Sequence, residues 1–261
     1  MKIFDAHVHV DARGFEDLRT IALYGTSEVT TFAHDALPFS CAGSVLDHFE
    51  RLLTLDSYRL RKCGITPHVG LGVHPRGIPG VGFDQVLDSM PALLRRSGVV
   101  AVGEIGLHTG SEVEIDVFGR QLGLAKSLGM PAVVHTPEKN KLDVTRRIIS
   151  VIEDVGIDLN QIIIDHASEE TFSLVRMFGC WVGVSVHPSK LSEERGASLI
   201  KQFGSERVIL NSDFASAFSD ILALPKTVLE MRSLGVPEAE IVAAVHDNAA
   251  RFYGLYPAGA K

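Results

Sequence analysis

Short apolar runs alternate along this chain with longer stretches in which apolar residues recur at helical spacing. Eight of the runs are rich in Val, Ile and Gly and show little alternation with polar residues. That pattern is typical of parallel strands whose two faces are both buried. We therefore predict strands at residues 2–9, 28–33, 66–73, 99–105, 131–135, 161–165, 181–186 and 207–212.

Helices are predicted between most of these strands. Glycine marks two of their ends, because Gly129 follows one series of apolar residues at helical spacing and Gly156 follows another. Pro91 is expected to interrupt a third series, because proline lacks the backbone N–H that a helix interior needs. The predicted helices cover residues 44–63, 83–90, 115–128, 142–155, 220–234 and 237–255.

The alternation of eight strands with helices in 261 residues predicts a (β/α)8 TIM barrel, an α/β fold for which about 250 residues is typical. The alternative architecture is an open, doubly wound sheet. Two observations favour the barrel: no GxGxxG motif follows the first strand, and polar residues close many strands instead of meeting at one switch point. No Pro/Ser-rich linker divides the chain, so we expect one domain over residues 1–261.

Composition narrows the classes of partner. Apolar residues make up 46% of the chain, which is enough for a substantial core, and the formal net charge is −7. We therefore expect no broad nucleic-acid-binding surface, although a local basic cleft stays open. The sequence gives no indication of oligomeric state.

The cysteines and the N-terminus indicate a location. The three cysteines, Cys41, Cys63 and Cys180, are scattered and match neither a disulfide framework nor a CxxC zinc site, so we expect buried free thiols. The chain passes from Lys2 directly into the first predicted strand, which is unlike a signal peptide. No run of about 18 apolar residues could span a membrane. A reducing cytoplasm is the expected location.

Side chains that bind metals close several of the predicted strands. His7 and His9 end the first strand, and because residues i and i+2 of a strand point to one face, both imidazoles can hold one ion. Other strands end in the same residue types, at equal intervals from residue 104 to 135 and from 135 to 166, which is about one strand–helix unit. The candidate ligands are His7, His9, Glu104, His135, His166 and Asp213.

In a barrel the C-terminal ends of the strands meet at one rim, where active sites of this fold are built. Asp213 would end the last strand and lie beside His7 and His9, so these three can hold one ion. The two histidines that end the fifth and sixth strands can hold a second ion. Glu104 would lie between the ions, and its two oxygens can bridge them.

Two divalent ions are therefore the expected cofactors. Imidazole ligands favour zinc, while the carboxylates keep manganese and magnesium open. A pair of ions makes bound water acidic and clamps the oxygens of a displacement, which predicts hydrolysis by a metal-bound hydroxide. Asp213 is the candidate general base as well as a ligand, and Glu104 is the second candidate catalytic residue, as the bridge.

Four further polar residues are expected to contact substrate at the same rim. Arg76 follows His74 and Pro75, and its planar guanidinium suits bidentate binding of a phosphate or carboxylate. A solvated loop arginine is the alternative reading of this residue. His108 and His187 follow the ends of two other strands, and we expect them beside the substrate or as acids for the leaving group.

Several sequence segments carry a resemblance to a known family. Asp5–His9 matches an opening HxH motif, Gly70–Pro75 a GxHP segment, and Val102–Leu107 a GEIGL signature. The family's order continues through Phe118–Leu122, Met130–His135, His166, Asn211–Asp213 and Asn248–Arg251. Over nearly its whole length the chain resembles a TatD-related metal-dependent hydrolase of the amidohydrolase superfamily.

The resemblance implies a barrel, a pair of divalent metals and hydrolase activity, often as a deoxyribonuclease or phosphoesterase. It also implies that Glu104 takes the bridging place that a carboxylated lysine holds in related phosphotriesterase-type enzymes. Every metal ligand of the family pattern is kept, and the departures fall at expected neighbours of the substrate, so the implied chemistry is kept while the substrate is left open. They are His108-Thr109, Thr136-Pro137, Ala167-Ser168 and Asn211-Ser212, where Asp-Tyr, Ser-Arg, a Cys-Phe-Ser-Gly-like run and Glu-Thr are usual.

The sequence thus predicts a TatD-like, metal-dependent hydrolase that acts on the phosphate ester of a small molecule or nucleotide. An amidohydrolase or lactonase that cleaves a C–N or C–O bond of a small metabolite is the alternative, because a two-metal site serves both reactions. A non-catalytic metal-binding barrel ranks lower, since no ligand is missing. Nuclease action on long DNA is disfavoured by the overall acidity and the missing Ser-Arg element.

Overall fold

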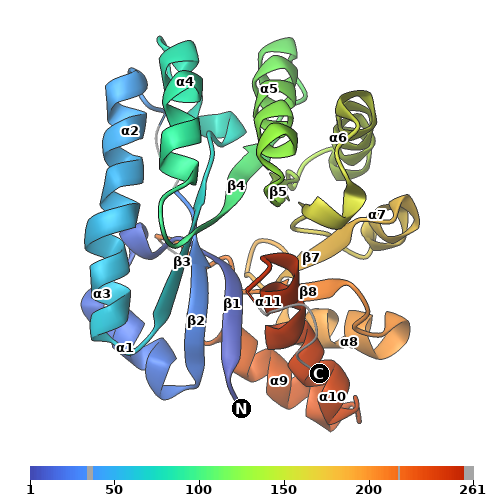
Figure 1. The fold of residues 1–261 in the computed structure, drawn as a ribbon. Coiled ribbons are helices and arrows are strands. Elements are labelled where there is room, and N and C mark those ends of the chain that lie inside the picture. The colour runs from blue at the N-terminus through green and yellow to red at the C-terminus, as the bar shows by residue number, and fades with distance from the viewer. Residues whose placement is uncertain (34–37, 217, 256–261) are drawn as a thin grey trace.

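A computed structural model describes residues 1–33, 38–216 and 218–255 of the chain. Its centre is an eight-stranded sheet in which the strands follow one another in chain order and each is parallel to its neighbours (Figure 1). The strands are β1 (Ile3–Val8), β2 (Thr26–Thr31), β3 (Thr66–Leu71), β4 (Val99–Gly106), β5 (Ala132–His135), β6 (Ile162–Ile164), β7 (Trp181–Ser185) and β8 (Val208–Asn211).

Backbone hydrogen bonds join the two ends of this sheet. Just beyond β8, Asp213 donates its N–H to the carbonyl of His7 at 3.0 Å, and His9 donates to the carbonyl of Phe214 at 2.9 Å. The last strand therefore meets the first at the C-terminal rim. The predicted (β/α)8 barrel and its eight strands are confirmed.

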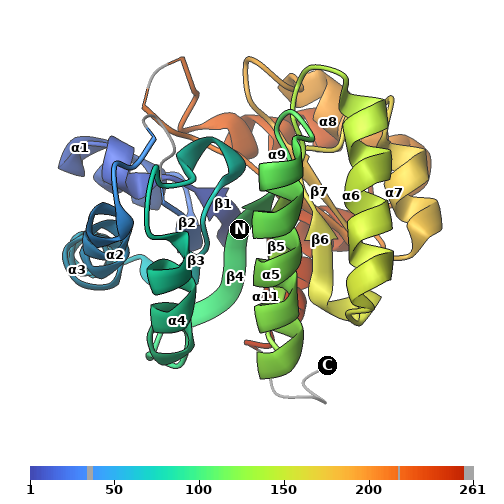
Figure 2. The same ribbon diagram turned by 90° about the horizontal axis from the view of Figure 1, so that it is seen from above.

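Helices follow the strands and surround the barrel, as the view from above shows (Figure 2). Gly129 and Gly156 end two of these helices, as the sequence predicted. Both are in the left-handed conformation, which glycine adopts without a steric penalty. The helices are α1 (Phe15–Leu23), α2 (Ala42–Arg51), α3 (Ser57–Lys62), α4 (Phe83–Leu94), α5 (Glu112–Leu128), α6 (Lys141–Val155), α7 (Phe172–Phe178), α8 (Glu193–Phe203), α9 (Ala223–Ser233), α10 (Glu238–Val242) and α11 (Asn248–Phe252).

Pro91 does not interrupt its helix, so that prediction was wrong. The helix α4 continues through the proline to Leu94. Its buried residues Val86, Met90 and Leu94 lie on one face and belong to the main hydrophobic cluster. Because this apolar face extends beyond Pro91, packing against the barrel favours the continued helix over the local preference of proline.

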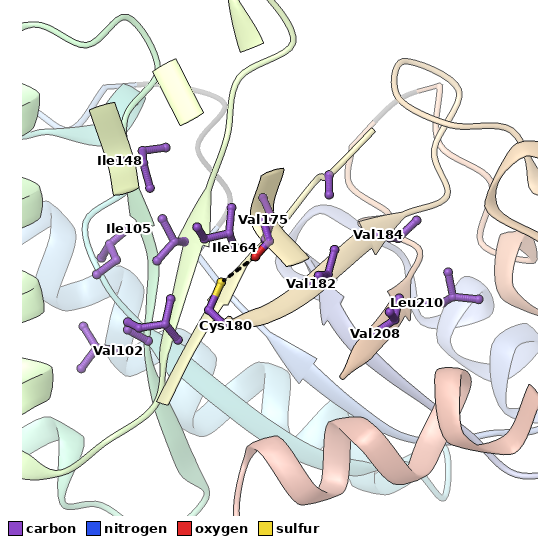
Figure 3. Packing of buried hydrophobic residues seen from close by; sticks show 14 of the residues in the cluster. Val102, Ile105, Ile148, Ile164, Val175, Cys180, Val182, Val184, Val208 and Leu210 are labelled. Carbon is purple, nitrogen blue, oxygen red and sulfur yellow. Dashed lines mark hydrogen bonds between the residues drawn. The ribbon is translucent and has the colours of Figure 1, made fainter. Parts of the chain in front are cut away.

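Successive side chains of the strands enter different buried clusters, because they point to opposite faces of the sheet. Figure 3 shows part of the main cluster, in which strand residues such as Val182 and Val208 are buried together with the helix residues Ile148 and Val175. The two faces are clearest on three strands, where Val133, Ile163 and Ile209 belong to one cluster and their neighbours Val134, Ile164 and Leu210 to another.

The described residues include no helix that is long and apolar enough to cross a membrane.

Candidate metal centre

Because side chains alternate between the two faces of a strand, several polar side chains lie on the inner face at the C-terminal rim. On β5, His135 lies two residues after the buried Val133 and so shares its face. Asp165 and Asn211 stand in the same relation to buried residues of β6 and β8, and all three polar side chains are buried. Buried polar groups are retained only where they find partners, so this rim is the place to look for a site.

His7 and His9 lie together at the end of β1, as predicted. Their ring centroids are 5.1 Å apart and both side chains are buried. The ring of Phe32 packs 4.5 Å from the ring of His7, and the carbonyl oxygen of Phe32 lies 3.2 Å from Nδ1 of His9. A carbonyl can only accept, so Nδ1 of His9 donates, and Nε2 is the nitrogen left for a metal ion.

Glu104 lies at the centre of the histidines. Its Oε1 is 3.0 Å from Nδ1 of His135 and 2.8 Å from Nε2 of His166. Its Oε2 lies 3.4 Å from Nε2 of His7. One buried carboxylate therefore reaches the ligands from β1, β5 and β6, which is the position that a bridging ligand needs.

Asp213 faces the same cluster from the end of β8. Its Oδ1 is 3.2 Å from Nε2 of His9 and 3.7 Å from Nε2 of His7, and its Oδ2 accepts a hydrogen bond from the ammonium of Lys190. Asp213 and His166 both have positive φ angles, 47° and 61°. Non-glycine residues rarely adopt this conformation, and where it occurs it clusters at functional sites.

The donor atoms fit a divalent cation. The Nε2 atoms of His7 and His135 are buried and have no hydrogen-bond partner among the described residues. Imidazole nitrogens beside carboxylates are the ligand set of zinc and related ions. In the part of the chain that the structure describes, three groups have donor atoms within 4.8 Å of one another: His7, His9 and Glu104; His7, His166 and Asp213; and His74, Glu104 and His135.

All six predicted ligands belong to these groups. His166 was expected to share an ion with His135. Its donor atom is grouped with those of His7 and Asp213, and both His166 and His135 lie within 3.0 Å of Oε1 of Glu104.

His74 was predicted as a substrate contact, and its hydrogen bond favours that role although its position also allows ligation. Its Nδ1 accepts the backbone N–H of Arg76 at 3.1 Å. A neutral imidazole that accepts at Nδ1 carries its proton on Nε2. In that tautomer the Nε2–H of His74 is a donor that lies 3.9 Å from Oε2 of Glu104.

Charges compensate one another in the metal-free cluster. Burial alone would raise the pKa of Glu104, but the neighbouring imidazoles, His7 first, hold it well below its ordinary value. Burial would lower the pKa of His7, but the Glu104 carboxylate raises it well above its ordinary value. A cation that binds here therefore displaces a proton from His7 and takes over the compensation of the carboxylates.

The cluster opens into a cavity of about 230 Å³. Two cationic side chains line it, the predicted Arg76 and also Lys190, together with the predicted His187 and the carboxylate of Glu138. Its lining residues are His9, His74, Arg76, Glu104, His135, Glu138, His166, His187, Ser189, Lys190, Asp213, Ala215 and Ser216.

His108 is the one predicted substrate residue that does not line this cavity. Its ring lies 5.8 Å from the ring of His135, and burial, followed by the charge of Arg76, lowers its pKa. The backbone N–H groups of His108, Thr109 and Gly110 all donate to Oε2 of Glu114, at 2.8, 2.8 and 2.9 Å. These bonds fix the loop that follows β4.

Sequence reasoning missed three charged residues of the site, Glu138 in the cavity lining, Lys190 and Asp165. Lys190 follows His187 by three residues, and its side chain is 9% exposed. Asp165 directly precedes His166, and its Oδ2 lies 2.7 Å from Nδ1 of His7. A signal was present for Asp165, because a carboxylate that ends a fully apolar strand requires a buried partner. None was present for Lys190, which lies in an otherwise ordinary polar loop.

Comparison with known proteins agrees with this geometry. The sequence model of the family described as "TatD related DNase" matches residues 4–254. A protein of Methanocaldococcus jannaschii, described as an uncharacterized metal-dependent hydrolase, is 41% identical over 254 residues, which cover 97% of this chain and 100% of the relative.

Solved structures show the same similarity in three dimensions. The TatD-like protein of Archaeoglobus fulgidus superposes with a TM-score of 0.82 at 30% identity, over 96% of this chain and 99% of that one. A TatD homologue of Escherichia coli superposes with a TM-score of 0.72 at 19% identity, over 98% of each chain. At 19% identity, the similarity to the Escherichia coli protein shows a shared fold alone.

Proposed function

The chain belongs to the family of TatD-related DNases and is a metal-dependent hydrolase, and from this we propose that it hydrolyses phosphate esters of small molecules or nucleotides. The observation that carries the proposal is a pair of cations beside the candidate ligands. Arg76 and Lys190 line the same cavity as Glu104 and Asp213. A phosphate ester needs such cations to hold its non-bridging oxygens.

Six residues would hold the metals: His7, His9, Glu104, His135, His166 and Asp213. We propose two divalent ions, with zinc favoured by the histidines and manganese or magnesium as the alternatives. When bound, such ions acidify water and neutralise negative charge on phosphoryl oxygens.

The side chains around the cavity have separate tasks in this proposal. Lys190 and Arg76 bind and orient the phosphate. The carboxylate of Asp213 accepts the proton of the attacking water, and the neighbouring ammonium of Lys190 holds that carboxylate in place. Nε2–H of His74 donates to an oxygen of the bound ester.

The size and charge of the site favour a small substrate. The cavity of about 230 Å³ is smaller than the usual range for pockets that hold drug-sized ligands, roughly 300–1,000 Å³. Glu138 contributes negative charge to its lining, and the chain carries a net charge of −7. A long polyanion would need a basic groove leading to the metals. We therefore place a nucleotide or a small phosphate ester ahead of long DNA.

The experiment compares four classes of substrate on one metal-loaded preparation. Mono- and diester p-nitrophenyl phosphates are assayed beside amides, lactones and single-stranded DNA, and metal content is measured on the same sample. We expect turnover of a phosphate ester that a chelator abolishes. Arg76→Ala should retain its metals and lose at least about tenfold in kcat/KM, as expected for a charge-assisted bond of about 1.5–3 kcal/mol.

Other outcomes would replace the proposal. Unchanged turnover in Arg76→Ala with metals intact would argue against phosphate binding at this rim. Turnover confined to amides or lactones would favour the C–N or C–O hydrolase. DNA cleavage at physiological salt that His135→Ala abolishes would favour a nuclease. Tight metal binding without hydrolysis of any panel member would favour a non-catalytic barrel.

A further inference from the structure

Asp165 is a buried carboxylate whose partners come from four directions. Its Oδ2 lies 2.7 Å from Nδ1 of His7. The backbone N–H of His166 donates to its Oδ1 at 2.7 Å. The amide of Asn211 donates to both oxygens, at 2.9 and 3.1 Å, and the hydroxyl of Ser185 lies 3.4 Å from Oδ1. The carboxylate is thus fully engaged and belongs to neither the cavity nor the ligand groups.

The sheet makes room for this carboxylate at one glycine. A Cβ atom at Gly183 of β7 would overlap Oδ1 of Asp165. Gly183 pairs with Ile209 of β8, and Ala167 donates its backbone N–H to the carbonyl of Gly183 at 2.9 Å. The neighbouring strand therefore leaves a space that the Asp165 carboxylate fills.

The contact with Asp165 decides which nitrogen of His7 can bind a metal. Every other polar partner of the two carboxylate oxygens can donate, so Asp165 acts as an acceptor and Nδ1 of His7 carries the proton. Nε2 of His7 then keeps its lone pair, and Nε2 is the buried atom without a hydrogen-bond partner among the described residues. A carboxylate behind a ligating histidine fixes its tautomer and its ring orientation in this way.

The same carboxylate reaches a second candidate ligand through a hydroxyl. Nδ1 of His166 lies 2.7 Å from Oγ of Ser185, which is also the atom close to Asp165. If Nε2 of His166 is to bind a metal, Nδ1 must carry the proton and donate to Ser185. The Ser185 hydroxyl is then left to donate to Asp165, so both histidines depend on one acceptor.

We infer that Asp165 is a positioning residue that holds His7 directly, and His166 through Ser185, in the tautomers and orientations that metal binding requires. It touches neither metal nor substrate. Its effect is on the affinity of the site for metal ions, and it is independent of the bond that the enzyme cleaves.

The variant Asp165→Asn tests this inference, because the substitution hardly changes the volume of the side chain. The amide oxygen is expected at the place of Oδ1, where His166 and Ser185 can donate, so the NH2 group faces Nδ1 of His7. Nδ1 must then accept, and the proton moves to Nε2, which blocks ligation. We expect zinc affinity of the metal-free protein to fall about 10- to 100-fold by calorimetry, the range found for partners of metal-ligating histidines.

Three further variants separate the position of the carboxylate from its charge. Gly183→Ala keeps the carboxylate but displaces it, so we expect weaker zinc binding, whereas Gly123→Ala, whose Cβ meets no atom within 4 Å, should bind like wild type. Asp143→Asn removes an equal charge at an exposed ion pair with Arg146 and should also bind like wild type.

The protonated nitrogen of His7 can also be identified by spectroscopy in the wild type, independently of any variant of Asp165. Histidine ring ¹H–¹⁵N spectra of the metal-free wild type, recorded at a pH high enough for the His7 ring to be neutral and with His7 assigned by its loss in His7→Gln, should show the remaining proton on Nδ1 of His7. Asp165→Asn should move it to Nε2. A wild-type His7 protonated only on Nε2, or wild-type zinc affinity in Asp165→Asn, would overturn the inference. Should Asp165→Asn fail to fold, the wild-type spectrum and Gly183→Ala decide.

Discussion

The ammonium of Lys190, three residues beyond His187, donates a hydrogen bond to the carboxylate of Asp213, which lies just past the end of β8. Both side chains line the cavity. Burial alone would lower the pKa of Lys190, but Asp213 raises it above its ordinary value, so the ammonium stays charged. One side of the candidate metal centre thus carries a fixed positive charge that an anionic substrate can meet.

Replacing Lys190 should weaken the binding of phosphate. In Lys190→Met the cavity loses a charge-assisted donor, for which about 1.5–3 kcal/mol is typical, so we expect KM for a phosphate ester and the inhibition constant of inorganic phosphate to rise at least about tenfold. The matched control is Lys226→Met, which breaks an exposed lysine–aspartate pair with Asp220 outside the cavity. Equal inhibition constants in Lys190→Met and wild type, with metal content unchanged, would exclude this role.

Glu114 should stabilise the fold in a pH-dependent way. Burial opposes its ionisation, but the Thr109 hydroxyl and three backbone N–H groups outweigh burial and hold its pKa below the ordinary value of 4.5. A lowered folded-state pKa stabilises the fold above the unfolded-state value, and this stabilisation is lost as pH falls through the folded-state value. We therefore expect Glu114→Gln to be less stable by about 1–2 kcal/mol at pH 7.

The difference between Glu114→Gln and wild type should shrink below about pH 4 in urea unfolding curves recorded from pH 7 downwards. A difference that stays constant, or that grows with acid, would show that the carboxylate charge is not what holds the loop after β4.

Gly70 provides the space that the ring of Phe32 occupies. A Cβ atom at this position would overlap the ring, which is fully buried and packs on His7. We expect Gly70→Ala to destabilise the protein by about 1–3 kcal/mol, the usual cost of overpacking. Gly123→Ala, in α5 and in open space, should be neutral or stabilising. Thermal unfolding of both variants measures the contrast, and a Gly70→Ala midpoint equal to wild type would contradict it.

Cys180 should resist alkylation in the folded protein. Burial raises the pKa of its thiol to about 12, whereas hydrogen bonding, first from Ser44, lowers the pKa of Cys41. Only the thiolate reacts, so iodoacetamide at pH 8 should label Cys41 quickly and Cys180 only after denaturation. Peptide mass spectrometry follows each site. Labelling of Cys180 in the native protein at the rate of Cys41 would mean that α7 and β7 open readily.

The barrel was predictable because its signal is local. Short runs of residues typical of strands marked all eight strands, and the residue types at their ends marked the rim, so His7, His135 and Asp213 could be placed near one another from chain order alone. The helix α4 was one exception, since its packed apolar face outweighs Pro91, and α1, α7 and α8 were not among the predicted helices. Tertiary burial of this kind is not visible in a local propensity.

The finer geometry of the site was not predictable in the same way. The contact between Asp165 and His7 joins β6 to β1 across the barrel, and it depends on the space left at Gly183. Lys190 reaches Asp213 from a loop of no special composition. Each is a long-range or backbone property that strand spacing does not encode.

The central claim is that these side chains form a metal centre with Glu104 in its middle. Elemental analysis of purified wild type and Glu104→Ala, with folding of both checked by circular dichroism, tests it most directly. We predict about two divalent ions per wild-type chain and one or none in the folded variant. A wild-type protein that is free of metal and cannot be reconstituted, or a Glu104→Ala protein with full metal content, would contradict the claim.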